Sequence, residues 1–238
     1  MKLYNIIGLF VFMATLLFPN VSFGEEKRIK IAIIDTGLQM FDSVAPYLCE
    51  KSLHKDFTGQ GMSDIVGHGT NITGIIASKI NSKKHCIVII KWFHSRKNYS
   101  QHSTEHRNDV IVLGIRYAVS IKAKYINLSL SGYKPNTYEK YEIGEALKLG
   151  IKVIVAAGNS AQNLSIKCNA FPACYKFQSE DFYVVANYYG QLRAKLSNYG
   201  GPVNYYEDGT DVTAGGRTFS GTSQSAARCT GNLVRFYD

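Results

Sequence analysis

Short apolar runs rich in β-branched residues recur along the chain. Each run has four to six residues and is almost uninterrupted by polar side chains. This is the pattern of strands that are buried on both faces of a parallel sheet. The predicted strands are residues 29–34, 87–90, 125–128, 151–155 and 182–186.

Between these runs, apolar residues recur at helical spacing. One predicted helix covers residues 108–121, and a second covers 138–149 and ends at Gly150, a residue type that suits the position just after a helix. Strands that alternate with helices predict an α/β fold, here a three-layer α/β/α sandwich around a mainly parallel central sheet. A length of 238 residues suits one such domain rather than two.

The N-terminal segment differs in kind from the rest. A basic residue precedes an apolar run over 6–18, and small residues follow at Ser22 and Gly24. That order is typical of a secretory signal, and the run is too short to span a bilayer. We therefore expect removal of residues 1–24, export to the periplasm or the extracellular space, no stable membrane anchor, and one domain over 25–238.

Composition and charge exclude some classes of protein. Apolar residues make up 45% of the chain and charged residues 19%, so long disordered segments are not expected. The net charge of +9 could suit an acidic partner, but the basic residues are scattered and no run exceeds two lysines. The sequence therefore predicts no nucleic-acid binding.

Five cysteines in an exported chain predict disulfides and at least one free thiol. Cys168 and Cys174 bracket a short loop and form the most natural pair, while Cys49 with Cys86 is a second pairing that the sequence leaves open. Cys229 shares a helical stripe with Ala226, Leu233 and Phe236, so we expect a buried thiol that acts as a small hydrophobic side chain.

Three separate segments carry residues used in nucleophilic catalysis. Asp35 ends the first predicted strand, and His68 stands between Gly67 and Gly69 at the start of a helical pattern. Ser223 begins another helix, where unsatisfied N–H groups can face a developing oxyanion. Taken singly, each has an ordinary explanation: a turn-forming aspartate, a surface histidine and a serine that caps a helix.

A fourth segment adds a carboxamide donor. Asn159 lies just past the predicted strand over 151–155. An acyl-transfer site needs such a donor for its oxyanion, and functional residues of parallel sheets gather at the carboxyl ends of the strands. The four segments together favour an acyl-transfer site at that edge of the sheet.

These segments resemble the subtilisin family of serine proteases, the subtilases. Five motifs follow one another in the order found in that family: Ile34-Asp35-Thr36-Gly37, Gly67-His68-Gly69-Thr70, Asn127-Leu128-Ser129-Leu130, Ala156-Ala157-Gly158-Asn159 and Gly221-Thr222-Ser223. The resemblance implies a secreted serine endopeptidase that acts on protein or peptide substrates through an acyl-enzyme. It also implies a monomer that needs no cofactor.

The resemblance assigns roles to individual residues. Ser223 would attack the scissile carbonyl, His68 would accept and return its proton, and Asp35 would orient the imidazole. The side chain of Asn159 and the backbone N–H of Ser223 would bind the oxyanion. The substrate-binding residues would be Ser129, Leu130, Ser131 and Gly158.

Three departures from the family pattern stand out. Ser131 takes the place of a glycine, which would narrow the pocket, and Ala227 takes the place of a proline after the nucleophile. The segment over 80–86 is short and carries two lysines where many relatives hold a calcium-binding loop. We therefore expect no metal site, and a stability that depends on the Cys49–Cys86 bridge rather than on calcium.

Two alternatives remain. The first is a catalytically inactive subtilisin-like protein that binds peptides or partners, against which the four intact site residues argue. The second is a metal-dependent hydrolase that uses His94, His102 and His106. His102 and His106 are four residues apart, but the sequence between them is not the H-E-x-x-H arrangement of such enzymes.

Overall fold

A mainly parallel sheet that contains all five predicted strands runs through the molecule. The structure, a computed structural model, describes residues 28–93 and 104–238; the expected signal segment over 1–24 lies outside them. The strands of the sheet are β1 (Ile29–Asp35), β2 (Lys55–Asp56), β3 (His85–Lys91), β4 (Tyr125–Leu128), β5 (Lys152–Ala156), β6 (Phe182–Tyr189), β7 (Leu192–Arg193) and β8 (Tyr205–Glu207). Their order is β2-β3-β1-β4-β5-β6-β7, with β8 also paired to β6. All pairs are parallel except β6–β7.

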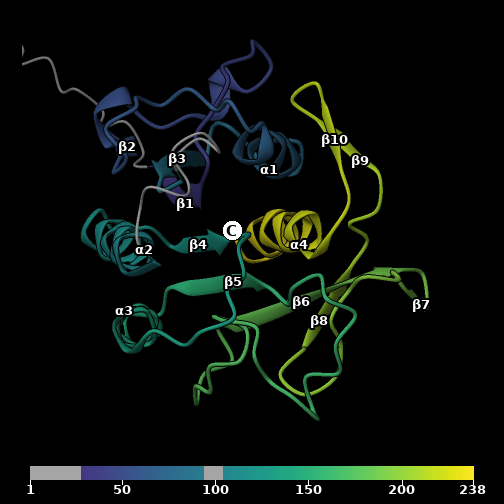
Figure 1. Cartoon of the computed structure of the whole chain (residues 1–238). Coiled ribbons are helices and arrows are strands. Elements are labelled where there is room, and N and C mark those ends of the chain that lie inside the picture. The colour runs from purple at the N-terminus through teal and green to yellow at the C-terminus, as the bar shows by residue number, and fades with distance from the viewer. Residues whose placement is uncertain (1–27, 94–103) are drawn as a thin grey trace, which may run out of the picture.

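Helices cover both faces of this sheet. The α-helices are α1 (His68–Ala77), α2 (Thr104–Ser120), α3 (Thr137–Lys148) and α4 (Thr222–Tyr237), and two short 3-10 turns, η1 (Ala45–Tyr47) and η2 (Lys51–Leu53), precede α1. Figure 1 shows α2 and α3 on one side of the sheet and α1 and α4 on the other. The predicted three-layer α/β/α sandwich is confirmed. A separate hairpin, β9 (Val212–Ala214) and β10 (Arg217–Phe219), precedes α4.

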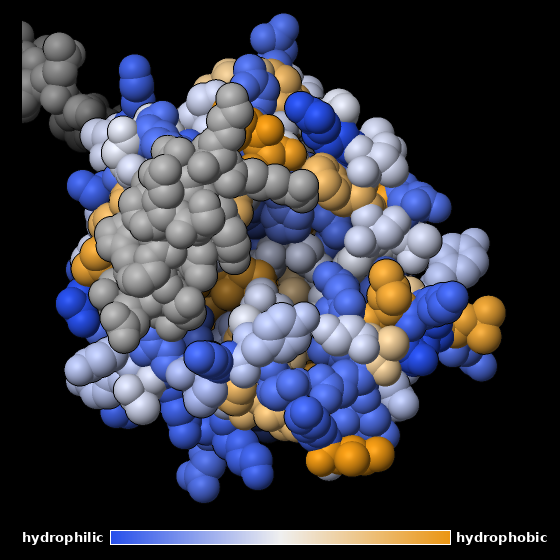
Figure 2. Space-filling model, viewed as in Figure 1, coloured by the Kyte–Doolittle hydropathy of each residue, from blue (hydrophilic) through white to orange (hydrophobic). Residues whose placement is uncertain are grey.

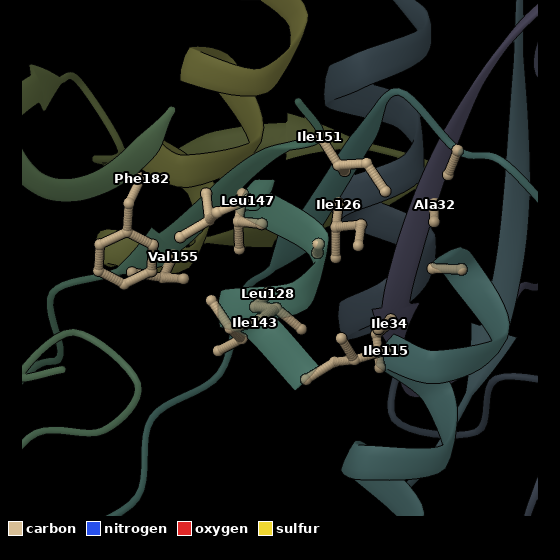
Figure 3. Close-up of a cluster of buried hydrophobic side chains, with 14 of the residues drawn as sticks. Ala32, Ile34, Ile115, Ile126, Leu128, Ile143, Leu147, Ile151, Val155 and Phe182 are labelled. Atoms are coloured by element: carbon tan, nitrogen blue, oxygen red, sulfur yellow. The ribbon is translucent and has the colours of Figure 1, made fainter. Parts of the chain in front are cut away.

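The strands are apolar on both faces because each face packs against a helical layer. Along β1, Ala32 and Ile34 face the cluster under α2 and α3, where Figure 3 shows them with Ile115 and Ile126. The alternating residues Ile31 and Ile33 join the second cluster, under α1 and α4. All four β1 side chains are fully buried. This two-sided burial accounts for the continuous apolar runs in the sequence.

The ends of α3 follow from local sequence. The Asn136 side chain accepts hydrogen bonds from the backbone N–H groups of Tyr138 and Glu139, which caps the first turn. At the other end Gly150 has a φ of +72°, in the left-handed region that glycine adopts without strain. The predicted helix end at Gly150 is therefore confirmed.

A buried carboxyl lies in the first turn of α3. Glu139 is 6% exposed, and its Oε2 accepts a hydrogen bond of 2.7 Å from the hydroxyl of Tyr175. Burial raises the pKa of Glu139 to about 6, against a smaller opposing effect of the Tyr175 hydrogen bond. The folded state therefore binds this proton more tightly than the unfolded state does.

The Glu139→Gln variant is expected to be more stable than the parent protein at neutral pH. Because the pKa is raised from 4.5 to about 6, the free energy of unfolding falls as pH rises through that window, by up to about 2 kcal/mol. The variant should lack that fall and should match the parent below pH 4.5. Denaturant melts between pH 4 and 8 measure the difference. Glu180→Gln, at an exposed site, is the control, and equal pH profiles for the two variants would contradict the expectation.

Two disulfides form in the structure. Cys49 is bonded to Cys86, and Cys168 to Cys174. Cys229 is a fully buried free thiol on α4, as expected from its apolar stripe. The expectation that Phe236 belongs to this buried stripe was wrong. Phe236 is 77% exposed, because the last turn of α4 extends past the edge of the core.

The described part of the surface in Figure 2 is mixed in hydropathy. Figure 2 shows hydrophilic residues over most of one face, with hydrophobic residues scattered among them in small groups. Within residues 28–93 and 104–238, no helix is both long enough and apolar enough to cross a bilayer.

Candidate active site

The predicted site residues follow the carboxyl ends of three neighbouring strands. Asp35 is the last residue of β1, Ser129 comes directly after β4, and Asn159 lies three residues past β5. Strands β1, β4 and β5 are adjacent and parallel, so their carboxyl ends share one edge of the sheet. That edge is where open α/β sheets place their functional groups.

An aspartate and a histidine contact each other at this edge. Oδ1 of Asp35 lies 2.7 Å from Nδ1 of His68, the first residue of α1. Asp35 is 3% exposed, and the same oxygen accepts the N–H of Thr36 at 2.8 Å. Because a carboxylate only accepts hydrogen bonds, Nδ1 carries the hydrogen and Nε2 is left as the basic nitrogen of the neutral ring.

The pKa of His68 is raised from its ordinary value. Burial, the largest single cause, lowers the pKa, but the charge and hydrogen bond of Asp35 and the charge of Asp64 together raise it by more. The protonated imidazolium is therefore favoured by its surroundings. A reaction that needs the neutral imidazole as a base should accordingly gain rate as pH rises through this raised pKa.

A glycine in α1 lets this helix lie close to the end of β1, which keeps His68 near Asp35. A Cβ at Gly69, in the first turn of α1, would lie 2.4 Å from the backbone oxygen of Gly37, which follows Asp35 by two residues. Any larger residue at position 69 would push α1 away from the end of β1. Phe219 of β10 also contacts the His68 ring in an edge-to-face arrangement, with ring centroids 5.8 Å apart.

The predicted nucleophile, Ser223, lies in the first turn of α4, the helix that packs next to α1. Ser223 is the second residue of α4, and its Oγ donates a hydrogen bond of 3.1 Å to the backbone oxygen of Ser129. The hydroxyl of Ser129 in turn donates to the backbone oxygen of Ser223 at 2.9 Å. Within the described part of the chain, no hydrogen bond joins Ser223 to His68. Catalytic hydrogen bonds of this kind often tighten only when substrate binds.

The predicted oxyanion donor is oriented by the residue before the serine. Oδ1 of Asn159 accepts the backbone N–H of Thr222 at 3.0 Å and its hydroxyl at 3.1 Å. With Oδ1 used in this way, the NH₂ group of the same amide is available to donate to a ligand at the start of α4.

The predicted substrate-binding residues line one pocket with Asn159 and Ser223. Its volume is about 230 Å³. It is lined by Ser129, Leu130, Ser131, Tyr133, Ala156, Gly158, Asn159, Ser160, Gln162, Asn169, Ala170, Asn198, Thr222 and Ser223. None of these side chains is charged. Gly158 has a φ of +98°, and a Cβ there would lie 2.5 Å from Nδ2 of Asn198 and 3.2 Å from Oγ of Ser131.

A disulfide-closed loop forms part of the pocket wall. The bridge from Cys168 to Cys174 encloses Asn169 and Ala170, which both line the pocket. The loop is tied to the segment after β4 because Phe171 and Gly132 exchange two backbone hydrogen bonds of 2.8 Å.

Two groups in the site have no counterpart among the residues expected from the sequence. Nε2 of Gln224 donates to Oδ1 of Asn71 at 3.1 Å, which joins the first turns of α4 and α1. Asp64 accepts five hydrogen bonds just before α1. An acidic residue close before a predicted helix was the available sequence signal for Asp64.

The alternative metal site was not tested, because it falls mostly outside the described part of the chain. His94 and His102 lie outside the described residues. Among the residues that are described, no three histidine, cysteine or acidic side chains gather closely enough to hold a metal ion.

Comparison with known proteins places this geometry in a family. The model of the Subtilase family, Peptidase S8, matches residues 26–237. A subtilisin-like protease of Coccidioides posadasii (strain C735) is 28% identical over 202 residues, which are 75% of this chain and 47% of that protein. Subtilisin E of Bacillus subtilis (strain 168) is 27% identical over 225 residues, 86% of this chain and 54% of that protein. The chain thus spans about half the length of the curated relatives it matches.

A relative whose name describes it as intracellular matches as well. The major intracellular serine protease of Bacillus subtilis (strain 168) is 30% identical over 149 residues, 57% of this chain and 44% of that protein. Among solved structures, that of a cold adapted subtilisin-like serine proteinase has a TM-score of 0.69 at 24% identity. It covers 87% of this chain and 74% of its own, and the likeness shows a shared fold.

Proposed function

The chain belongs to the subtilase family, and from that premise we propose that it is a serine endopeptidase that hydrolyses peptide bonds of protein substrates. In this proposal Asp35, His68 and Ser223 form the catalytic triad and Asn159 supplies a side-chain donor to the oxyanion. The observation that carries the proposal is the contact of 2.7 Å between His68 Nδ1 and the buried Asp35, beside a pocket that holds Ser223 and Asn159.

The first half of the reaction forms an acyl-enzyme. The Ser223 hydroxyl turns from the Ser129 carbonyl towards His68, gives its proton to Nε2, and Oγ bonds to the scissile carbonyl carbon. Asp35 stabilises the imidazolium that results. His68 then returns the proton to the leaving amine as the C–N bond breaks. In the second half, water repeats these steps and releases the acid and the free serine.

Two donors stabilise the oxyanion formed in each half. The backbone N–H of Ser223 lies in the first turn of α4, where helical N–H groups have no partner within the helix. The NH₂ group of Asn159 is held in place through its own Oδ1, which Thr222 binds. Donors fixed before the reaction lower the barrier because they need no reorganisation as charge develops.

The pocket beside these donors would hold the substrate side chain next to the scissile bond. Ser129, Leu130 and Ser131 follow β4 on one side, and Gly158 stands on the other. The exposed hydroxyl of Ser131 lies close to Gly158 and reduces the space between the two walls. An uncharged pocket of about 230 Å³ is suited to small or medium uncharged side chains.

A fluorophosphonate probe tests the activity directly. Such a probe reacts only with a serine activated by a neighbouring base, so Ser223 in the purified protein should be labelled and the label should map to its peptide. The same preparation is also expected to hydrolyse members of a peptide library. A protein that binds peptides but takes up no label would be the inactive relative considered as the alternative.

Export to the periplasm or the extracellular space is part of the proposal. It is supported by the signal-like order of residues 1–24 and by two disulfides, which persist in oxidising compartments. The mature chain is then expected to begin near Glu25. N-terminal sequencing of protein from the medium or periplasm checks this, and a chain that still begins with Met1 would contradict removal of the signal.

A further inference from the structure

A second buried aspartate lies between the ends of β1 and α1. Asp64 is 3% exposed, and its two oxygens accept five hydrogen bonds. The donors are Thr36 Oγ1 at 2.8 Å, Val66 N at 3.1 Å, Gly67 N at 2.8 Å, Thr70 N at 2.9 Å and Thr70 Oγ1 at 2.7 Å. Within the described residues no cation forms an ion pair with this carboxylate, so neutral donors hold it in place.

The hydroxyl groups among these donors show that Asp64 acts as an acceptor. Thr36 Oγ1 already accepts the N–H of Gly69 at 2.8 Å, and Thr70 Oγ1 accepts the N–H of Gln39 at 2.9 Å. The hydrogen of each hydroxyl is therefore free to point at Asp64. A carboxyl group that receives five donors has the bonding pattern of an ionised carboxylate.

The same hydrogen bonds join the two catalytic elements. Asp64 holds the side chain of Thr36, whose backbone N–H holds Oδ1 of Asp35 at 2.8 Å. On the other side Asp64 binds N–H groups at the start of α1, where the N-cap residue, Gly67, has no side chain with which to cap the helix. A negative group at this helix end also suits the helix dipole.

We propose that Asp64 is a positioning residue of the active site, whose buried carboxylate fixes the end of β1 against the start of α1 so that Asp35 and His68 stay in hydrogen-bond contact. It touches neither the substrate nor the reacting atoms. Asp64 affects the reaction through the placement and the charge of the His68 imidazole. This role for Asp64 rests on the proposed peptidase function.

The charged groups around this network come from three elements. Asp35 lies on β1, and the buried Lys91 of β3 donates to the backbone oxygens of Gly61 and Ser63, just before Asp64. Arg217 of β10 packs against Gly67. The charge of Asp64 raises the pKa of His68 after the larger effects of burial, which lowers it, and of Asp35, which raises it. Loss of the Asp64 charge should therefore lower the His68 pKa.

The Asp64→Asn variant of the full chain tests the proposal. An amide presents NH₂ to groups that are all donors, so part of the network must break. We expect kcat on a peptide substrate to fall roughly 10- to 100-fold with little change in KM, because small displacements of catalytic groups carry losses of that size. The acid limb of kcat/KM should move to lower pH. Asp42→Asn, which removes an equal charge at an exposed site, should match the parent.

A second measurement does not depend on activity. In the Ser223→Ala background, NMR titration of the His68 ring, assigned by its loss in His68→Gln, should give a lower pKa with Asp64→Asn than with Asp42→Asn. A peptidase assay that fails in the parent would refute the proposed function and leave this titration as the test of Asp64. Equal His68 pKa values in the two variants would overturn the positioning role.

A third pair of variants covers the case in which Asp64→Asn does not fold. Thr36→Val removes the hydroxyl between Asp64 and the Gly69 N–H, while Thr36→Ser keeps it. The kcat of Thr36→Val should be roughly 10-fold or more below that of Thr36→Ser. The kcat of Thr36→Ser should stay close to the parent value. Equal kcat in these two variants would overturn the proposal.

Discussion

Replacing Ser223 with alanine is expected to reduce kcat on a peptide substrate by about 10⁶-fold, the size of the loss that removal of the nucleophile causes in subtilisin, a member of the same family. The reason is that an alanine side chain has no oxygen with which to form the acyl-enzyme, whereas the Asp35–His68 contact and the oxyanion donors remain. Residual hydrolysis would then come from those donors and from binding alone. Steady-state kinetics together with fluorophosphonate labelling measure the change.

Two controls accompany this experiment: the thermal stability of the Ser223→Ala variant, and a substitution at a nearby serine. The Ser223 hydroxyl makes one hydrogen bond, to the carbonyl of Ser129, so its loss should leave the thermal midpoint nearly unchanged. Ser220→Ala, three residues earlier and exposed, makes the same chemical change outside the proposed triad. If Ser223→Ala kept the activity of Ser220→Ala, the assignment of the nucleophile would be wrong.

The second large effect is expected at Asn159. Replacing it with alanine should lower kcat by about 10²–10³-fold with little change in KM, the range measured for this type of oxyanion donor in subtilisin. The substrate carbonyl needs this donor chiefly when it becomes an oxyanion, so the loss falls on the transition state.

One complication is that Asn159 also holds Thr222 through Oδ1. Asn159→Asp separates the two roles because it keeps an acceptor for Thr222 and replaces the donor with a negative charge. If the donor is what matters, the aspartate variant will be at least as slow as the alanine variant. Recovery of activity in the aspartate variant would instead assign the loss to the displaced α4.

The central strands of the sheet could be predicted from the sequence because burial on both faces leaves a strong local signal. Strand β4 was predicted with its observed bounds, and β1, β3, β5 and β6 within a few residues. The short strands β2, β7 and β8 and the hairpin β9–β10 were not predicted. They have two or three residues each and are largely exposed or half-buried, so their pairing depends on neighbours distant in sequence.

The site was predictable only in part, for a similar reason. Asp35, His68, Asn159 and Ser223 stand in motifs that can be read along the chain. The hydrogen bonds that orient them join segments far apart in sequence: Thr222 to Asn159, and Gln224 to Asn71, which are 63 and 153 residues apart. No local pattern encodes such contacts, because they exist only once α1 and α4 lie side by side on the sheet.

One wall of the proposed substrate pocket lies on a different segment from the proposed catalytic triad. The loop from Cys168 to Cys174 is covalently closed and meets the rest of the pocket through the Phe171–Gly132 pairing, whereas the proposed triad stands on β1, α1 and α4. Residues 169–173 therefore form a segment that can be exchanged as a unit in protein engineering. We expect that exchanging them while the bridge is kept would change the substrate preference and leave the proposed triad in place.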